Sequence, residues 1–173
     1  MTGLVARAIN ATTPLRAALL VLAVAFATIA GAWIFQWVGY APCELCLKQR
    51  WAYYAGVPLA AIVAGVAAGG ARAATIAGLA ALALIFTGSA IFGAYHAGVE
   101  WGFWQGPQDC TGSITRAPSM DDFLKQLDTV KVVRCDAVAI RILGLSLAGW
   151  NAVISTGLAC AALLGATRSM TKI

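Results

Sequence analysis

Two cysteines separated by two residues, Cys43 and Cys46, have the type and the spacing that several kinds of chemistry require. They lie in the stretch APCELCLKQRW at 41–51, between two long apolar runs, and Arg50 follows the second cysteine at position i+4. A Cys-x-x-Cys pair can bind zinc, form a structural disulfide or alternate between dithiol and disulfide. These three uses need different surroundings. The other cysteines, and the segments that position them, therefore indicate which use applies.

Three further cysteines are Cys110, Cys135 and Cys160. Cys160 lies in the middle of an apolar segment, where a free cysteine packs as a small hydrophobic side chain. The other four allow three disulfide pairings; Cys43 and Cys46 pair most easily because they are neighbours, and Cys110 and Cys135 would then close a loop of about 25 residues. A zinc site usually has two Cys-x-x-Cys knuckles. The second pair is not of this form, so we expect no metal ligands.

A redox role explains the Cys43–Cys46 pair better than a structural one. A disulfide that spans two residues restricts the unfolded chain very little, so it adds little stability. A reactive cysteine must be available as a thiolate, which a nearby cation or a helix N-terminus favours. Cys46 meets both conditions, because an apolar segment begins shortly after it and Arg50 at i+4 would share its helical face. The alternative role for Arg50 is to extend from a membrane edge toward water.

The chain that carries these residues is suited to a lipid environment. Of its 173 residues, 61% are hydrophobic and 11% are charged, whereas a soluble domain has about 25% charged residues. Four apolar segments, at about 17–38, 51–68, 73–95 and 147–166, approach the roughly 20 residues that a helix needs to cross a bilayer. Their apolar residues do not alternate with polar ones, which argues against a transmembrane β-barrel. We therefore predict an all-α membrane protein, a four-helix transmembrane bundle that forms a single domain over residues 1–173.

Charged residues distinguish the two sides of the predicted bundle. Four spans place both termini on one side, and this side carries basic residues but no acidic ones: Arg7, Arg16, Arg72, Arg168 and Lys172. All seven acidic residues fall on the other side. The positive-inside rule makes the basic side cytoplasmic, so the loops at about 39–50 and 96–146 face outward. Orientation also accounts for the net charge of +5, because the basic residues form no stripe that would bind nucleic acid.

The outward side of a bacterial cytoplasmic membrane is oxidising, so a redox pair placed there needs an electron acceptor. One histidine cannot form a bis-histidine haem site, and the chain has neither a Rossmann glycine fingerprint nor an outward phosphate-binding loop. A lipid-soluble carrier that reaches the pair from within the bilayer is the remaining option. Quinones fit, because they accept two electrons and dissolve in the membrane.

Three stretches of the chain together resemble the DsbB family of membrane thiol–quinone oxidoreductases: CELCLKQR at 43–50, YHAGVEWGFWQGPQDC at 95–110 and VRCDAVAIRILGLSLAGWN at 133–151. The resemblance covers essentially the whole chain, with four spans, a Cys-x-x-Cys in the first outer loop and a distant cysteine pair in the second. It implies an enzyme of the bacterial inner membrane that sustains disulfide bond formation. The expected partner is a periplasmic DsbA-like oxidase of thioredoxin fold, and the expected cofactor is diffusible ubiquinone or menaquinone.

The resemblance also implies roles for the four outer cysteines. Cys110 and Cys135 would form the disulfide that oxidises the partner, with Cys110 as the sulfur that the partner attacks. Cys43 and Cys46 would reoxidise that pair, and Cys46 would be the thiolate that meets the quinone. The resting pairing stays open, because a Cys43–Cys135 disulfide is also a plausible trapped intermediate.

Two further residues match positions that the family places beside the quinone, Arg50 and His96. The chain departs from the family pattern at Gln49, where members often carry an acidic residue. We expect this change to leave Arg50 less neutralised and the neighbouring thiolate more favoured. It puts in doubt any role for a carboxylate at this position.

The second outer loop must serve both a soluble partner and a pair at the membrane edge. Its first part, GPQDCTGSITRAPS at 106–119, is rich in turn-forming residues. The following stretch, SMDDFLKQLDTV at 119–130, predicts a short amphipathic helix that begins at Ser119 and lies on the membrane surface. The alternative is that this helix docks the partner.

Two other functions compete with the DsbB-like one. Vitamin K epoxide reductases also combine four helices, a Cys-x-x-Cys and a loop pair, but in that family the loop pair precedes the Cys-x-x-Cys, whereas here it follows. The second competitor is a non-enzymatic membrane scaffold with two structural disulfides. Mild reduction separates it from a relay, because structural disulfides should resist reduction and relay disulfides should be labile.

Overall fold

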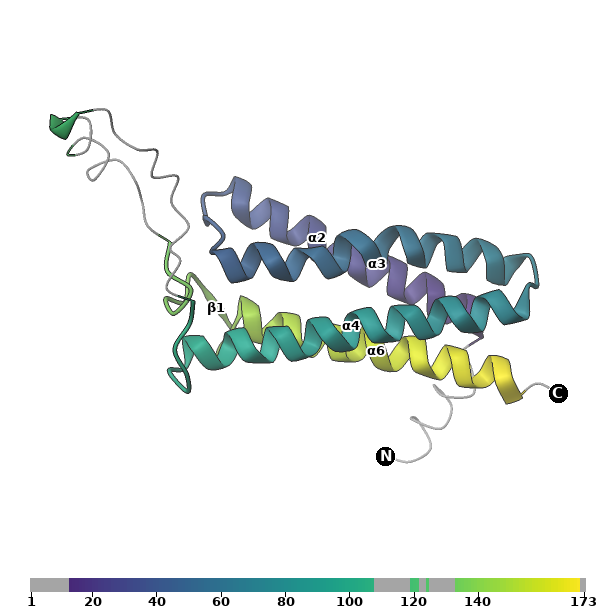
Figure 1. Cartoon of the computed structure of the whole chain (residues 1–173). Helices are drawn as coiled ribbons and strands as arrows, with labels where there is room; N and C mark the ends of the chain where they lie inside the picture. Colours follow the sequence, from purple (N-terminus) through teal and green to yellow (C-terminus); the bar gives the residue numbers. More distant parts are fainter. Residues whose placement is uncertain (1–12, 108–118, 122–123, 125–132, 172–173) are drawn as a thin grey trace.

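Four long helices form one bundle in the computed structural model, which describes residues 13–107, 119–121, 124 and 133–171 (Figure 1). Each is long and apolar enough to cross a membrane, which confirms the predicted all-α four-helix membrane protein. The helices are α2 (Pro14–Trp37), α3 (Glu44–Ala68), α4 (Arg72–Glu100) and α6 (Leu147–Thr171). A two-stranded antiparallel hairpin, β1 (Arg141–Ile142) and β2 (Leu145–Ser146), leads into α6.

Helix α3 begins at Glu44, earlier than the apolar segment predicted from Trp51. Its first turns are polar, and their Glu, Leu, Lys, Gln and Arg residues are good helix formers that hydropathy alone does not register. Cys43 caps the helix, because its side chain accepts a hydrogen bond from the backbone N–H of Cys46, and Lys48 pairs with Glu44 at 2.5 Å. The Cys43–Cys46 pair therefore lies at a helix N-terminus, although the sequence predicted an outer loop over about 39–50.

Helix α4 likewise extends beyond its predicted end at Tyr95 and reaches Glu100. The added turn contains His96, which is therefore held on a rigid element. The α2–α3 connection, the C-terminal end of α4 and the hairpin lie at one end of the bundle, and the α3–α4 turn and the end of α6 lie at the other (Figure 1). The cysteines of the two predicted outer loops that the structure describes thus share one end.

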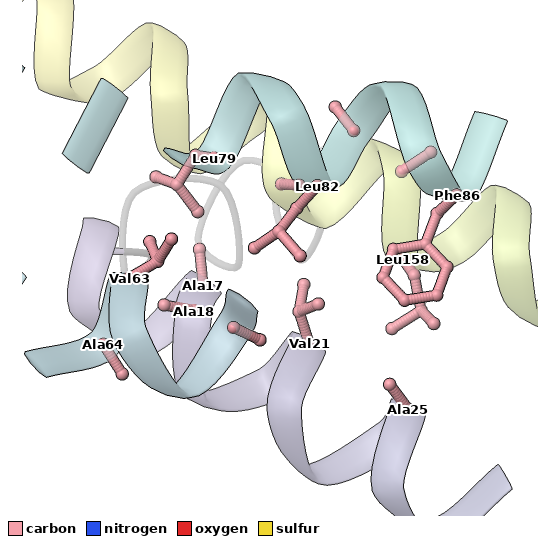
Figure 2. Packing of buried hydrophobic residues seen from close by; sticks show 14 of the residues in the cluster. Ala17, Ala18, Val21, Ala25, Val63, Ala64, Leu79, Leu82, Phe86 and Leu158 are labelled. Carbon is pink, nitrogen blue, oxygen red and sulfur yellow. The ribbon is translucent and has the colours of Figure 1, made fainter. Parts of the chain in front are cut away.

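Small residues let the helices pack closely, as is usual in membrane bundles. The buried core joins alanines and Val21 of α2 to Leu79, Leu82 and Phe86 of α4 and Leu158 of α6 (Figure 2). A Cβ added at Gly165 would lie 2.6 Å from the Cβ of Ala17, so this glycine is required for the close approach of α6 to α2.

Buried polar side chains also join the helices. The hydroxyl of Tyr53 on α3 donates to Asn151 Oδ1 on α6 at 2.6 Å and lies 3.1 Å from Ser155 Oγ. Ser155 in turn donates to Ser89 on α4 at 3.0 Å. Hydrogen bonds between helices help to hold a membrane bundle together, because the hydrophobic effect does not drive helix association within lipid.

The predicted amphipathic helix at 119–130 falls largely outside the described residues. Met120, Asp121 and Leu124, which are described, are helical and exposed. Cys110 also lies outside the described part of the chain, so its role stays a prediction.

Candidate active site

Three segments bring thiols and a histidine together at one end of the bundle. The N-terminus of α3 supplies Cys43 and Cys46, the last turns of α4 supply His96, and the segment before β1 supplies Cys135. Cys43, His96 and Cys135 are buried, with 4%, 1% and 7% of their surfaces exposed. Leu45 and Val99 pack between them, so water has little access to this cluster.

The two sulfurs of the Cys-x-x-Cys are in direct contact. Cys43 Sγ donates to Cys46 Sγ at 2.8 Å, and Cys43 Sγ also accepts from the Cys46 N–H at 3.2 Å. Both residues are free thiols in this structure. Because the two side chains already meet, the pair can pass between dithiol and disulfide without a large movement of the helix.

Cys135 lies against the same pair. It packs in one buried cluster with Cys43 and with Leu45 of the first turn of α3. The family resemblance left a Cys43–Cys135 disulfide open as a trapped intermediate, and the structure places the two residues in one cluster. The contact allows thiol–disulfide exchange between the loop pair and the Cys-x-x-Cys.

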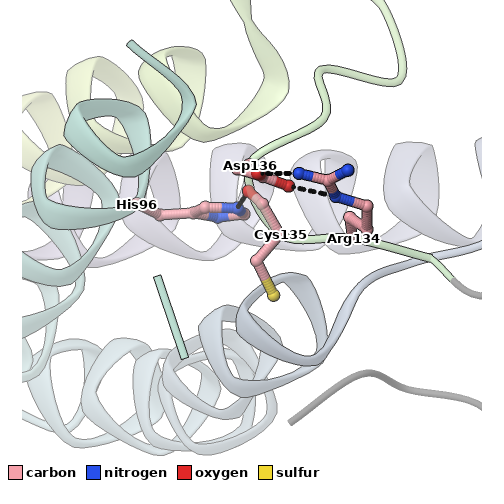
Figure 3. Close-up of polar contacts among 4 residues, drawn as sticks. All are labelled: His96, Arg134, Cys135 and Asp136. Atoms are coloured by element: carbon pink, nitrogen blue, oxygen red, sulfur yellow. Dashed lines mark hydrogen bonds and ion pairs between the residues drawn. The ribbon is translucent and has the colours of Figure 1, made fainter. Parts of the chain in front are cut away.

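His96 joins the three segments of the site. Its Nδ1 atom is 2.7 Å from Gln49 Nε2, and its Nε2 atom is 3.6 Å from Cys43 Sγ. The same Nε2 atom is 3.3 Å from the backbone oxygen of Cys135 (Figure 3). With the Gln49 amide donating to Nδ1, the ring carries its proton on Nε2. That N–H group is then directed toward the Cys43 sulfur and the Cys135 carbonyl.

The two thiols outside the helices hold their protons firmly. The hydrogen bond to Cys46, followed by burial, raises the pKa of Cys43 to about 12. Burial is also the main cause that raises the pKa of Cys135. In the reduced pair Cys43 therefore keeps its proton, and Cys46, in the first turn of α3 where the helix dipole favours negative charge, is the sulfur better placed to carry charge.

The raised pKa of Cys43 predicts how its reactivity depends on pH. Alkylation requires the thiolate, so in the reduced protein its rate at Cys43 should rise about tenfold per pH unit between about pH 7 and 10 without levelling off. The same cysteine in denatured protein should level off above its ordinary pKa of roughly 8.5. Fragment mass spectrometry after short iodoacetamide pulses measures both rates. A plateau below about pH 9 in the folded protein would contradict the assignment.

Arg50 is directed toward α2. Its guanidinium donates to Gln36 Oε1 at 2.6 Å and to the backbone oxygen of Ala32 at 3.4 Å. Beside it, Trp33 Nε1 donates to the hydroxyl of Tyr54 at 3.1 Å, and the two ring centroids are 6.2 Å apart. These two hydrogen bonds of Arg50 join α3 to α2, and neither is to a sulfur, although Arg50 follows Cys46 by one helical turn.

Gln49 is a site residue whose place the sequence did not predict. We expected its effect to fall on Arg50, but it is 8% exposed and bonds to His96. Its spacing of three from Cys46 on a helix could have indicated that both face the same neighbour. Glu100 at the end of α4 was also not singled out, and its Oε2 atom is buried without a hydrogen-bond partner among the described residues.

A cavity of about 610 Å³ adjoins Cys135. Its wall includes Trp104, whose ring stacks on Tyr95 with centroids 5.8 Å apart. Arg134 and Asp136 flank the cysteine and pair with each other at 2.9 Å (Figure 3). The cavity offers the buried thiol a route to molecules outside the bundle.

Comparison with known proteins gives one match. Residues 14–165 match the family model of the disulfide bond formation protein DsbB. The matched range includes the Cys-x-x-Cys, both cysteines of the second loop, Gln49, Arg50 and His96. No curated protein and no solved structure matches the chain.

Proposed function

The chain belongs to the DsbB family of disulfide bond formation proteins, and from this premise we propose that it is a protein-disulfide:quinone oxidoreductase. It reoxidises a periplasmic DsbA-like oxidase of thioredoxin fold and passes the two electrons to ubiquinone or menaquinone. Its outer loops and thiol cluster face the periplasm in this proposal, in keeping with the excess of basic residues on the other side. The family match favours this reaction over that of the vitamin K epoxide reductases.

The observation that carries the proposal is the convergence of Cys43, Cys46 and Cys135 in one buried cluster. A scaffold with two structural disulfides has no need to bring the two pairs together. A relay does, because exchange requires a sulfur of one pair to reach a sulfur of the other.

In the first half of the relay, the partner is oxidised at the loop pair. A thiolate of the partner attacks Cys110, a mixed disulfide forms, and Cys135 leaves as a thiolate. The second thiol of the partner then displaces Cys110. The partner departs with a disulfide, and Cys110 and Cys135 hold its two electrons as a reduced pair.

In the second half, the electrons move to the Cys-x-x-Cys. The Cys135 thiolate attacks Cys43, and Cys46 leaves as a thiolate. Cys110 then displaces Cys43 from Cys135, which restores the Cys110–Cys135 disulfide and leaves Cys43 and Cys46 reduced. The packing of Cys135 in one buried cluster with Cys43 supports this order of attack.

A quinone, when bound, supplies the oxidant, because it can accept two electrons and two protons. Arg50 would hold a ring carbonyl oxygen, since its guanidinium is half-buried between α2 and α3. Trp33 and Tyr54 would provide an aromatic wall beside it. The residues present thus fit a flat ring with polar oxygens at the edge of the thiol cluster.

His96 holds a proton at the sulfur that is attacked. Its Nε2–H is directed toward Cys43 Sγ and the Cys135 carbonyl, which keeps the two exchanging segments together. Gln49 fixes this tautomer through Nδ1. We therefore propose that His96 serves the thiols directly and that Gln49 positions it.

Substitution of Gln49 with Glu should slow turnover, because it changes the contact that positions His96. A carboxylate only accepts hydrogen bonds, whereas the Gln49 amide can donate to Nδ1. We expect quinone reduction to fall by about tenfold, measured from the absorbance of quinone with reduced partner in excess. Gln49→Met, which removes the hydrogen bond and keeps the size of the side chain, should slow turnover similarly. Wild-type rates in both variants would show that Gln49 does not position His96.

The proposed function is tested by mixing the purified protein with a reduced DsbA-like protein and a soluble quinone. The absorbance of the quinone should fall over many turnovers, and both the partner and the protein should be required. The scaffold alternative predicts no consumption of quinone beyond the control without protein.

A further inference from the structure

We propose that the reduced cluster binds a thiophilic divalent cation, Zn²⁺ or its probe Co²⁺, through Cys43, Cys46 and His96. The sulfur atoms of the two cysteines and a ring nitrogen of the histidine all lie within 4.8 Å of one another. The sequence disfavoured zinc because it shows no second Cys-x-x-Cys. The fold instead supplies the third donor from α4.

The spacing of the donors suits a tetrahedral ion. With bonds of about 2.3 Å to sulfur and 2.0 Å to nitrogen, tetrahedral ligands are separated by about 3.5 Å for S–N and about 3.75 Å for S–S. Cys43 Sγ and His96 Nε2 are already 3.6 Å apart. The two sulfurs are 2.8 Å apart, so only they must separate, which rotation of the partly exposed Cys46 side chain allows.

The surroundings favour two thiolates and a neutral imidazole. Both cysteines lie at the N-terminus of α3, where the helix dipole stabilises negative charge. A histidine that binds a metal usually donates its other ring N–H to an oxygen, which orients the ring. The Gln49 amide beside Nδ1 can present its oxygen by turning over, and Nε2 is then free to bind. A carboxylate at this position could only accept a hydrogen bond. The Gln49 amide can donate to Nδ1 in the metal-free ring and can accept from Nδ1–H in the metal-bound ring.

Binding exchanges protons and moves no electrons. The cation gains two thiolates, two thiol protons go to water, and the sulfur oxidation state does not change. A disulfide offers no thiolates, so the oxidised pair does not hold the cation. The bound cation therefore keeps Cys43 and Cys46 reduced, and its effect on turnover, though not the binding itself, rests on the proposed function.

The binding test uses full-length protein in detergent, reduced and then freed of reductant, and titrated with Co²⁺. We expect one equivalent to give the absorption of a tetrahedral thiolate complex, Zn²⁺ to displace it, and the oxidised protein to show none. Single variants Cys43→Ser, Cys46→Ser and His96→Asn should each weaken binding by at least about tenfold, so any one that folds decides the outcome. The matched control is Cys160→Ser, because Cys160 is exposed on α6 and should leave the titration unchanged.

Two results would overturn the site: no tetrahedral spectrum in reduced protein, or a titration that is unchanged in any folded ligand variant. Neither measurement needs a partner or a quinone, so failure of the metal site is distinguishable from failure of the relay. With the relay assay in place, one equivalent of Zn²⁺ should slow turnover and a chelator should restore it. Unchanged turnover with the site occupied would refute the inhibitory effect.

Discussion

Replacement of Cys46 with serine is expected to lower quinone reduction by at least about 10³-fold. The serine hydroxyl cannot form a disulfide, so electrons that reach Cys43 have no second sulfur to complete the transfer. The geometry gives Cys46 this place, because Cys43 donates its proton toward it at 2.8 Å and the dipole of α3 favours its charge. The measurement is the absorbance of quinone with reduced DsbA-like partner in excess.

The control for this prediction is Cys160→Ser. Cys160 is exposed on α6 and lies outside the thiol cluster, so its loss should leave turnover at the wild-type rate. Undiminished turnover in Cys46→Ser would exclude the relay. Equal losses in both variants would show that any cysteine change damages the protein, and the role of Cys46 would then be unsupported.

The largest expected effect on stability comes from Phe86→Ala. Phe86 is fully buried, and its ring meets Tyr53 edge to face with centroids 5.6 Å apart. Removal of a buried phenylalanine leaves a cavity that costs about 3–5 kcal/mol in soluble cores. We expect about 3 kcal/mol here, because the lost term is packing between helices rather than transfer from water.

The matched control is Leu84→Ala on the same helix. Leu84 is 75% exposed and faces outward, so its removal should change stability by less than about 0.5 kcal/mol. Unfolding by denaturant in detergent, followed by far-ultraviolet circular dichroism, compares the two variants. Equal stability of Phe86→Ala and Leu84→Ala would contradict the packing described for the core.

The sequence predicted the four helices because hydropathy reports directly which segments prefer lipid. It did not predict that α3 starts at Glu44, since helix formation there depends on the Cys43 cap and on helix-forming polar residues rather than on apolar content. For the same reason, the sequence did not predict that Gln49 lies in α3. A residue expected near Arg50 turned out to bond to His96.

The contacts of the site depend on the packing of segments that are distant in sequence. The sequence placed Cys43 and Cys135 on the same side of the membrane, but only the packing of the segment before β1 against the start of α3 brings them together. Arg50 illustrates the opposite case: the i+4 spacing to Cys46 is correct, yet the long side chain bonds to Gln36 and Ala32 on α2. The spacing of residues along a helix indicates which of them share a face of that helix. The contacts that each side chain makes depend on how the neighbouring elements pack.

The most direct test of the relay is a disulfide map of Cys46→Ala, prepared under non-reducing conditions after exposure to oxidant. Without Cys46, Cys43 is a free thiol whose thiolate can attack Cys135 of the Cys110–Cys135 disulfide and release Cys110 as a thiolate. We therefore expect a peptide joined through Cys43 and Cys135. The Cys160→Ser protein serves as the comparison and should show no such peptide at rest. A map with only the Cys110–Cys135 disulfide, and Cys43 free, would contradict the transfer between the two pairs.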